Sequence, residues 1–280
     1  MKYSRYVVTP HWLHAHLDDP GMVVVDASWY LPAHNRDPYA EYLDQHVPGA
    51  VFFDIDKLSD PASKLPHTLA SPEHFAQEVG KLGISETDTI VVYDGMGLFS
   101  AARAWWNFRI MGADEVFILD GGFPLWLSER LPTGTGHRPP PVKTFKPEFR
   151  ADRVIDFDAM NAAVKAADHA IADARPAGRF SGSDPEPRKG MRSGHMPGAT
   201  NIPASSLIRD GKLLPLAELG SVLDEAGLND GPTITTCGSG VTAAIISLAL
   251  DSLGRTDHKL YDGSWSEWGG RDDTEIEVSE

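Results

Sequence analysis

The chain of 280 residues contains a single cysteine, Cys237, within the stretch ITTCGSGVTAA at 234–244. A β-branched run precedes it and an apolar helical run follows, so the pattern predicts a strand, a tight turn and a helix. Backbone N–H groups in such a turn, and the positive end of the helix dipole, favour the thiolate. The glycines beside the sulfur leave it open to a reagent, which favours a reactive cysteine over a buried structural one.

Five loop residues follow the cysteine: Gly238, Ser239, Gly240, Val241 and Thr242. We expect their backbone amides to stabilise negative charge on the sulfur and to contact a bound substrate. The hydroxyl of Ser239 lies adjacent to the thiol in sequence. It is suited to stabilise oxygen charge or to supply a proton during a nucleophilic reaction.

The composition, with 41% hydrophobic and 23% charged residues, is that of a globular protein of one large domain or two smaller ones. The net charge of −15 argues against nucleic acid or an anionic membrane as the main partner. One cysteine cannot form an intrachain disulfide, and the first residues, MKYSRYVVTPHW, lack the apolar core of a secretory signal. The apolar run at 241–250 is too short to span a bilayer. We therefore expect a cytoplasmic protein.

Strands and helices alternate along the chain, which predicts an α/β fold with parallel sheets. Compact apolar runs predict strands at 22–26, 88–94, 116–119, 170–173 and 233–236. Helical spacing predicts helices at 10–17, 71–83, 100–111, 156–167 and 241–250. Between 132 and 149 the glycines and three successive prolines exclude a regular element. We expect this stretch to link an N-terminal domain at 1–131 to a C-terminal domain at 150–280.

The second domain repeats the first in sequence. Three signals recur in order and at a nearly constant offset: an apolar run ending in Asp-Ala, a His-X-Pro-Gly-Ala turn, and Asp-Gly with a later tryptophan. They begin at Asp26, His46 and Asp120 in the first half and at Asp173, His195 and Asp262 in the second. In this register Asp94 falls opposite Cys237, so only the second half carries the thiol.

With these motifs in order, the chain resembles the tandem-domain rhodanese superfamily of sulfurtransferases, and its CGSGVTA loop resembles that of the 3-mercaptopyruvate sulfurtransferases within it. The shared motifs are HVPGAVFFDID, WW at 105–106, LDGG, DAR followed by GRF, PEPRKG, GHMPGATNIP, CGSGVTA and YDGSWSEW. The resemblance implies two rhodanese-like domains, each with a central, mainly parallel sheet flanked by helices. It also implies that the N-terminal domain is catalytically silent.

The resemblance implies that Cys237 accepts a sulfur atom from 3-mercaptopyruvate as a persulfide and passes it to a thiol or cyanide, releasing pyruvate. A soft thiolate nucleophile suits this reaction. Arg179 and Arg188 stand where the family binds the substrate carboxylate and keto oxygen, a task for planar, permanently charged donors. Arg175 follows a strand, a place that suits a structural salt bridge at least as well as substrate binding, so we leave it out of the core site. Asp262 and Trp265 are expected to shape the edge of the site.

For the family a Ser-His-Asp set reaching across the domains has been suggested, and we assign it here to Ser239, His46 and Asp37. For His46 and Asp37 a structural role is the alternative to a catalytic one. His46 can simply close its turn, as His195 can in the repeat, and Asp37 sits in a polar RDP turn.

Three other functions remain open. A thiosulfate-using rhodanese has a cationic Cys-Arg-Lys-Gly-Val-Thr loop, whereas Gly238 and Ser239 are neutral here. A phosphatase of related fold needs an arginine six positions after the cysteine, where this chain has Ala243. A non-enzymatic module that senses oxidants through Cys237 is the third, and Arg179 and Arg188 argue against it.

The chemistry of the thiol requires no metal and no organic cofactor. His11, His14 and His16 cluster in the first expected helix, but no cysteine or carboxylate pattern accompanies them, so we expect no metal site there. The expected partners are 3-mercaptopyruvate as donor and thioredoxin or a small thiol as acceptor, with no nucleic acid or membrane.

Overall fold

The computed structural model describes residues 2–137, 139–229 and 231–279. The N-terminal half contains a five-stranded sheet in which every adjacent pair is parallel, in the order β1-β5-β4-β2-β3. Its strands are β1 (Val7–Val8), β2 (Met22–Asp26), β3 (Val51–Phe52), β4 (Thr89–Tyr93) and β5 (Val116–Leu119). Short, largely buried strands of this kind are typical of a sheet covered by helices on both faces.

The C-terminal half contains a second parallel sheet, in the order β6-β12-β11-β7-β8. Its strands are β6 (Val154–Ile155), β7 (Ala170–Asp173), β8 (Ala199–Asn201), β11 (Thr233–Thr236) and β12 (His258–Tyr261). Each strand takes the position of its counterpart in the first sheet, which confirms the predicted repeat and the tandem α/β fold. A short antiparallel hairpin, β9 (Ile208–Arg209) with β10 (Lys212–Leu213), is added in this half.

The helices also repeat between the halves. Those of the first half are α1 (Pro10–His16), η1 (Pro32–His34), α2 (Pro38–Asp44), α3 (Pro72–Lys81), α4 (Ala101–Ile110) and α5 (Gly122–Ser128). Those of the second half are η2 (Ala151–Arg153), α6 (Phe157–Ala166), α7 (Ala177–Ser181), η3 (Ala204–Leu207), α8 (Leu216–Glu225), α9 (Ala243–Ser252) and α10 (Ser264–Trp268). Thr9 caps α1 as the sequence predicts, because its side chain accepts a hydrogen bond from the amide of Trp12.

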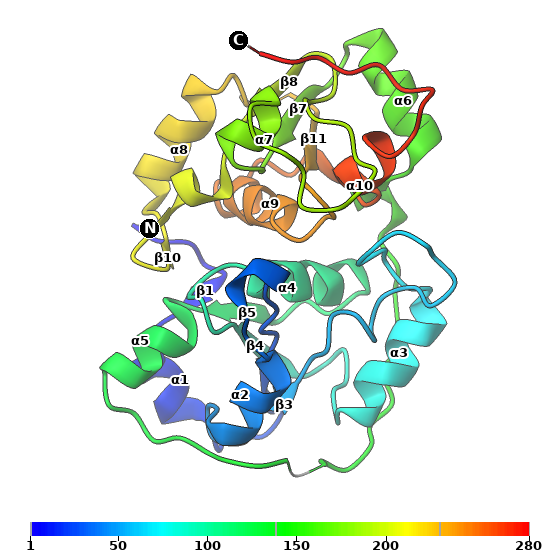
Figure 1. Ribbon diagram of the computed structural model, residues 1–280. Helices are drawn as coiled ribbons and strands as arrows, with labels where there is room; N and C mark the ends of the chain where they lie inside the picture. Colours follow the sequence, from blue (N-terminus) through cyan, green and yellow to red (C-terminus); the bar gives the residue numbers. More distant parts are fainter. Residues whose placement is uncertain (1, 138, 230, 280) are drawn as a thin grey trace.

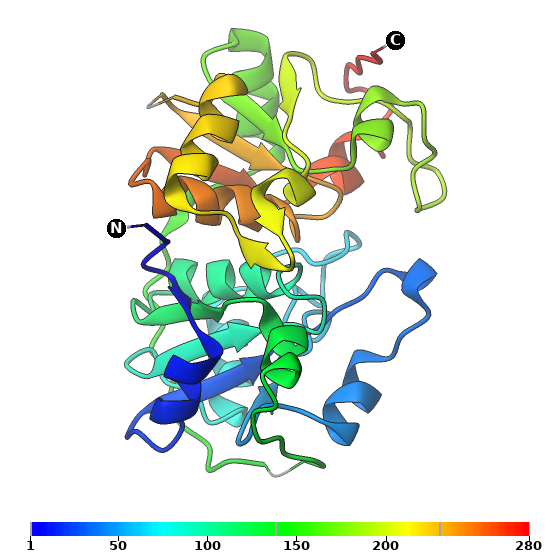
Figure 2. The ribbon, with the colours of Figure 1, turned by 90° about the vertical axis from the view of Figure 1, so that its left-hand side faces the viewer.

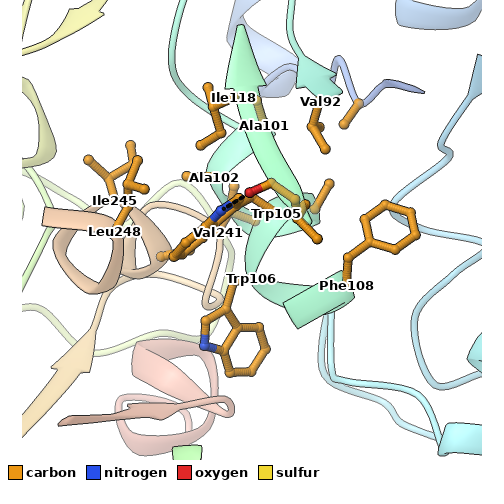
Figure 3. Close-up of a cluster of buried hydrophobic side chains, with 14 of the residues drawn as sticks. Val92, Ala101, Ala102, Trp105, Trp106, Phe108, Ile118, Val241, Ile245 and Leu248 are labelled. Atoms are coloured by element: carbon orange, nitrogen blue, oxygen red, sulfur yellow. Dashed lines mark hydrogen bonds between the residues drawn. The ribbon is translucent and has the colours of Figure 1, made fainter. Parts of the chain in front are cut away.

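The two domains pack through α4 and α9, which lie against each other between the two sheets (Figure 1). Both helices are buried along almost their whole length, as expected for helices with apolar residues on every side. Figure 3 shows Trp105 and Ala102 of α4 facing Val241, Ile245 and Leu248 across this contact. One continuous hydrophobic core therefore joins the domains.

The N-terminal segment reinforces this contact, and both views place it at the level of the interface (Figures 1 and 2). The carbonyl of Lys2 accepts a hydrogen bond from the amide of Leu216, and the hydroxyls of Ser4 and Ser252 lie 2.6 Å apart.

The stretch between the domains runs along the outside of the N-terminal domain and has no helix or strand in its described part (Figure 1). Its Lys143 pairs with Asp88 at 2.7 Å, and Phe145 is buried against Phe75 and Phe108. We propose 132–149 as the linker between domains at 1–131 and 150–280, although positions 1, 138 and 280 lie outside the described residues.

Among the helices of the described ranges, none is long and apolar enough to cross a membrane.

Candidate active site

Cys237 directly follows β11, and α9 begins six residues later at Ala243. The predicted strand, turn and helix around the cysteine are therefore present. In a parallel α/β sheet the carboxyl ends of the strands form one edge, where ligands bind. Arg175, after β7, and Asp262, after β12, lie at the same edge as the cysteine.

The first turn of α10 fixes the cysteine loop. The amides of Trp265 and Ser266 donate hydrogen bonds to the carbonyls of Cys237 and Gly238, at 2.9 and 2.8 Å. The hydroxyl of Ser266 also donates to the Gly238 carbonyl at 2.6 Å, and the Cys237 amide lies 3.4 Å from Ser264 Oγ. The backbone of Cys237 and Gly238 is therefore held by α10, which limits how far the thiol can move.

A cavity of about 340 Å³ opens at this loop and is lined by both domains. The C-terminal domain contributes Arg179, Arg188, Cys237 and Ser239, and its loop residues Gly238, Val241 and Thr242 line the same space. The N-terminal domain contributes an apolar wall that includes Trp29, Leu98 and Phe99. Cys237 is only 2% exposed, and it lines this cavity between the domains.

The two predicted substrate arginines thus lie together at the cavity. Arg179 is held by Glu186, with Nη2 at 2.5 Å from one carboxylate oxygen and Nε at 3.2 Å from the other. Among the residues that the structure describes, Arg188 donates one long hydrogen bond, 3.4 Å, to Ser266 Oγ. Burial and the neighbouring Arg179 charge lower the pKa of Arg188, and the negative charge of the Cys237 thiolate opposes this shift. An anion bound beside the thiol would therefore relieve an unfavourable concentration of positive charge.

Arg175 lines the cavity as well, but its guanidinium is committed to carboxylates. It pairs with Asp173 at 2.7 Å and with Glu186 at 2.8 Å, and it stacks on the Trp265 ring with 4.2 Å to the centroid. The structural salt bridge predicted for Arg175 is confirmed.

Both loop glycines lie close to guanidinium groups. A Cβ at Gly238 would lie 3.0 Å from Nη2 of Arg179. Gly240 has a left-handed backbone with φ of +78°, and a Cβ there would lie 2.7 Å from Nη1 of Arg103. A side chain at Gly240 would therefore clash with Arg103, whereas one at Gly238 would press on the Arg179 guanidinium.

The structure brings His67, and not His46, to Ser239. His67 Nδ1 lies 2.8 Å from Ser239 Oγ, and Nε2 lies 3.2 Å from the carboxylate of Asp56. The hydrogen bond from His67 lowers the pKa of Asp56, which keeps this carboxylate ionised. His67 is 4% exposed and its ring packs edge-on against Trp29. A Ser-His-Asp set does span the two domains, and its members are Ser239, His67 and Asp56.

The assignment of His46 and Asp37 to this set is wrong on geometric grounds. The ring of His46 stacks on Tyr42 and its Nδ1 donates to the Tyr42 carbonyl at 2.7 Å, while Nε2 faces Gly134. His46 therefore has a structural role, but its ring contacts Tyr42 and Gly134 and does not close the HVPGA turn, whose Ala50 amide donates to the Val47 carbonyl. Asp37 caps α2, where its carboxylate accepts hydrogen bonds from the amides of Tyr39 and Ala40.

The N-terminal domain has a carboxylate at the position where the C-terminal domain has the thiol. Asp94 directly follows β4, as Cys237 follows β11, which confirms the predicted register. The Asp94 carboxylate accepts hydrogen bonds from the amides of Met96, Phe99 and Ala101 at 2.7–2.9 Å. The loop that could bind an anionic ligand in this domain is thus occupied by its own side chain.

Within the described ranges, no three His, Cys, Asp or Glu side chains gather in a way that would hold a metal ion.

Two parallel sheets and a single cysteine on a strand-to-helix loop define a tandem rhodanese architecture, and the rhodanese-like domain family matches residues 9–129 and 156–271. The chain therefore belongs to the rhodanese family. Its full-length relatives make it, more narrowly, an enzyme of the sulfurtransferase class.

These relatives match nearly the whole chain. The 3-mercaptopyruvate sulfurtransferase of Escherichia coli K12 is 43% identical over 276 residues, covering 98% of each chain. The rat 3-mercaptopyruvate sulfurtransferase is 39% identical, covering 99% of this chain and 96% of the relative. The crystal structure of SseA from Escherichia coli superposes with a TM-score of 0.86 at 41% identity, covering 94% of this chain and 99% of the other.

Proposed function

We propose that this protein transfers the sulfur atom of 3-mercaptopyruvate, through a persulfide on Cys237, to a thiol or cyanide acceptor and releases pyruvate. One observation carries the proposal: Cys237, Arg179, Arg188 and Ser239 line a single cavity. The cavity thereby combines a nucleophile for sulfur, two cations for an α-keto acid and a hydroxyl beside the reacting atoms.

In the first half-reaction the Cys237 thiolate attacks the donor sulfur. A bond forms between Sγ and that sulfur, and the bond between the donor sulfur and C3 of mercaptopyruvate breaks. The electron pair passes to the enolate of pyruvate, and protonation at C3 gives pyruvate. Arg179 and Arg188 bind the carboxylate and the keto oxygen, where charge develops, so they act on both binding and the transition state.

Ser239, His67 and Asp56 provide the route for the proton. The proton that leaves the Cys237 thiol is held by the Ser239 and His67 pair and is then delivered by the Ser239 hydroxyl to the departing carbon. Asp56 faces the far nitrogen of His67 at 3.2 Å, so its negative charge stabilises the imidazolium formed in between. No net proton is gained or lost in this half-reaction.

In the second half-reaction an acceptor thiolate attacks the outer sulfur of the persulfide and restores the Cys237 thiolate. Thioredoxin or a small thiol, or cyanide, fits this role by its nucleophilicity. We propose the cytoplasm as the compartment, because a lone cysteine used for catalysis is kept reduced there.

Thiosulfate is the alternative donor, and one relative, from Arabidopsis thaliana, is named thiosulfate/3-mercaptopyruvate sulfurtransferase 1. The neutral Gly238 and Ser239 favour mercaptopyruvate, because a dianionic donor would gain from cations at these positions. The comparison that decides is kcat/KM for the two donors with one acceptor. We expect mercaptopyruvate to be preferred by at least about tenfold. A clear preference for thiosulfate would refute the assignment of the donor.

A further inference from the structure

Arg103 of α4 is a fully buried arginine that reaches from the N-terminal domain to the cysteine loop. Its Nη2 donates to the carbonyl of His67 at 2.8 Å and to the carboxylate of Asp262 at 2.6 Å. Its Nη1 lies 3.3 Å from the carbonyl of Gly240, and the guanidinium stacks on Trp106. One side chain thus contacts the histidine that faces Ser239, the loop that carries Cys237, and a carboxylate of the other domain.

Asp262 completes the attachment of the His67 loop. Its second oxygen accepts a hydrogen bond from the amide of Leu69 at 2.7 Å, while the first is bound to Arg103. His67 is therefore held through its own carbonyl and through the amide two residues further on. His67 has a left-handed backbone with φ of +60°, which is unfavourable for a residue with a Cβ and persists only when neighbouring contacts enforce it.

The opposite side of the pseudo-symmetric interface shows that domain packing alone does not need this ion pair. There Gly211 stands five residues before α8, as His67 stands five before α3. Gly211 packs on Gly97, where a Cβ would lie 2.6 Å from the Gly211 Cα. The third residue of α9 is the apolar Ile245, where the third residue of α4 is Arg103. The buried Arg103–Asp262 ion pair lies on the side that carries the thiol, and in the described residues the equivalent position of α9 is apolar.

We infer that Arg103 is a positioning residue for the reaction: with Asp262 it holds His67 in reach of Ser239 when the two domains are packed together. This inference rests on the proposed function, in which Ser239 and His67 carry the proton. A buried charge is costly unless it is fully paired, so its placement beside the site calls for a role beyond packing. Arg103 is fully buried and is not among the residues that line the cavity at Cys237, so we assign it no contact with the substrate.

The test is a double-mutant cycle of Arg103→Met with Ser239→Ala, in which kcat and KM are measured from the release of pyruvate from 3-mercaptopyruvate. If Arg103 acts through the His67–Ser239 contact, Arg103→Met lowers kcat by about tenfold or more, with KM changed by less than about threefold. In the Ser239→Ala background it then causes no further loss. Losses that multiply in the double variant would overturn the inference, because they mean that Arg103 acts independently of Ser239.

Asp262→Asn, cycled with Ser239→Ala in the same way, replaces Arg103→Met if that variant does not fold. Ser4→Ala is the matched control: it removes the interdomain hydrogen bond to Ser252, away from the cavity. We expect it to leave kcat within about twofold of the wild type. An equal loss of kcat in Ser4→Ala and Arg103→Met would indicate a general packing effect and would overturn the inference.

A second readout does not depend on turnover. NMR of ¹⁵N-histidine-labelled protein follows the His67 ring, which we expect to change in the same way in Arg103→Met and in Ser239→Ala, because both variants remove the contact between His67 Nδ1 and Ser239. An unchanged His67 signal in Arg103→Met would contradict the inference. If both variants change the His67 signal in this way but the wild type releases no pyruvate, the result counts against the proposed function and leaves the role of Arg103 in place.

Discussion

His67 of the N-terminal domain and Ser239 of the C-terminal domain, 172 positions apart in sequence, lie 2.8 Å apart at Nδ1 and Oγ. The N-terminal domain thus contributes a side chain to the candidate active site even though it has no cysteine. Its Trp29, Leu98 and Phe99 also form one wall of the cavity. An isolated C-terminal domain would keep Cys237, Arg179 and Arg188 but lose the histidine, its carboxylate partner and the enclosure of the thiol.

His67→Asn is expected to lower kcat for pyruvate release by about ten- to a hundredfold, because Ser239 loses the partner with which it exchanges a proton. KM for mercaptopyruvate should change little, since His67 is not among the residues that line the cavity. Steady-state kinetics with a fixed acceptor give both constants.

His46→Asn is the matched control, because His46 is also a buried histidine of the same domain. It loses a hydrogen bond to Tyr42 and a ring contact, so we expect the free energy of unfolding to fall by about 1–2 kcal/mol. Its kcat should stay close to that of the wild type. A selective loss of kcat in His46→Asn would restore His46 to the catalytic set and count against His67.

Arg188→Met is expected to raise KM for mercaptopyruvate by about tenfold or more, because the substrate carboxylate loses a charged donor in an enclosed site. Arg188 donates one long hydrogen bond to the described part of the chain, so its removal should alter the melting temperature little. Arg209→Met, which breaks an exposed ion pair with Glu218, is the control and should leave KM unchanged. If both variants have the KM of the wild type, Arg188 does not bind the donor.

Gly238→Ala is expected to displace the Arg179 guanidinium, because the new Cβ would lie 3.0 Å from Nη2 and Glu186 holds that guanidinium in place. We expect KM to rise about threefold to tenfold with the fold retained. Gly220→Ala is the control. Position 220 lies inside α8 with open space around a Cβ, so alanine there should stabilise the protein by about 0.5–1 kcal/mol without altering kinetics. An unchanged KM in Gly238→Ala would show that Arg179 moves freely.

Asp26→Asn is expected to make stability less dependent on pH. Burial raises the pKa of Asp26 to about 6, above its ordinary value of 3.8 in the unfolded chain. The folded state therefore binds the extra proton, and stability falls as pH rises from about 4 to about 6. Denaturant titrations should show the variant more stable than the wild type by up to about 3 kcal/mol above pH 6, and equal to it below pH 4. A difference that is constant with pH would indicate a packing effect instead.

The position of Cys237 and the tandem architecture could be predicted from the sequence because both depend on local patterns. Strands 116–119, 170–173 and 233–236 have the predicted bounds, and the recurring Asp-Ala and Asp-Gly signals placed Asp94 opposite Cys237 correctly. Such signals come from strand ends and turns, where a few neighbouring residues determine the backbone.

The histidine could not be predicted in the same way, because its contact with Ser239 depends on how two domains pack. His46 and His195 make the same interactions in the two halves: each stacks on a nearby aromatic ring and donates to a main-chain carbonyl. Their recurrence in the sequence favoured a structural role. His67 has Gly211 as its counterpart in the second half. This difference between the two halves was the feature of the sequence that could have indicated a functional role for His67. Arg103 likewise replaces an apolar residue, but only the domain contact shows what it binds.

The most direct test of persulfide formation is intact-protein mass spectrometry after incubation with 3-mercaptopyruvate in the absence of an acceptor. The wild type should gain the mass of one sulfur atom, release one equivalent of pyruvate, and lose the added mass when a thiol acceptor is supplied. Cys237→Ser should gain no sulfur and release no pyruvate. A wild type that releases pyruvate without gaining sulfur on Cys237, or a Cys237→Ser variant that remains active, would contradict a persulfide on Cys237.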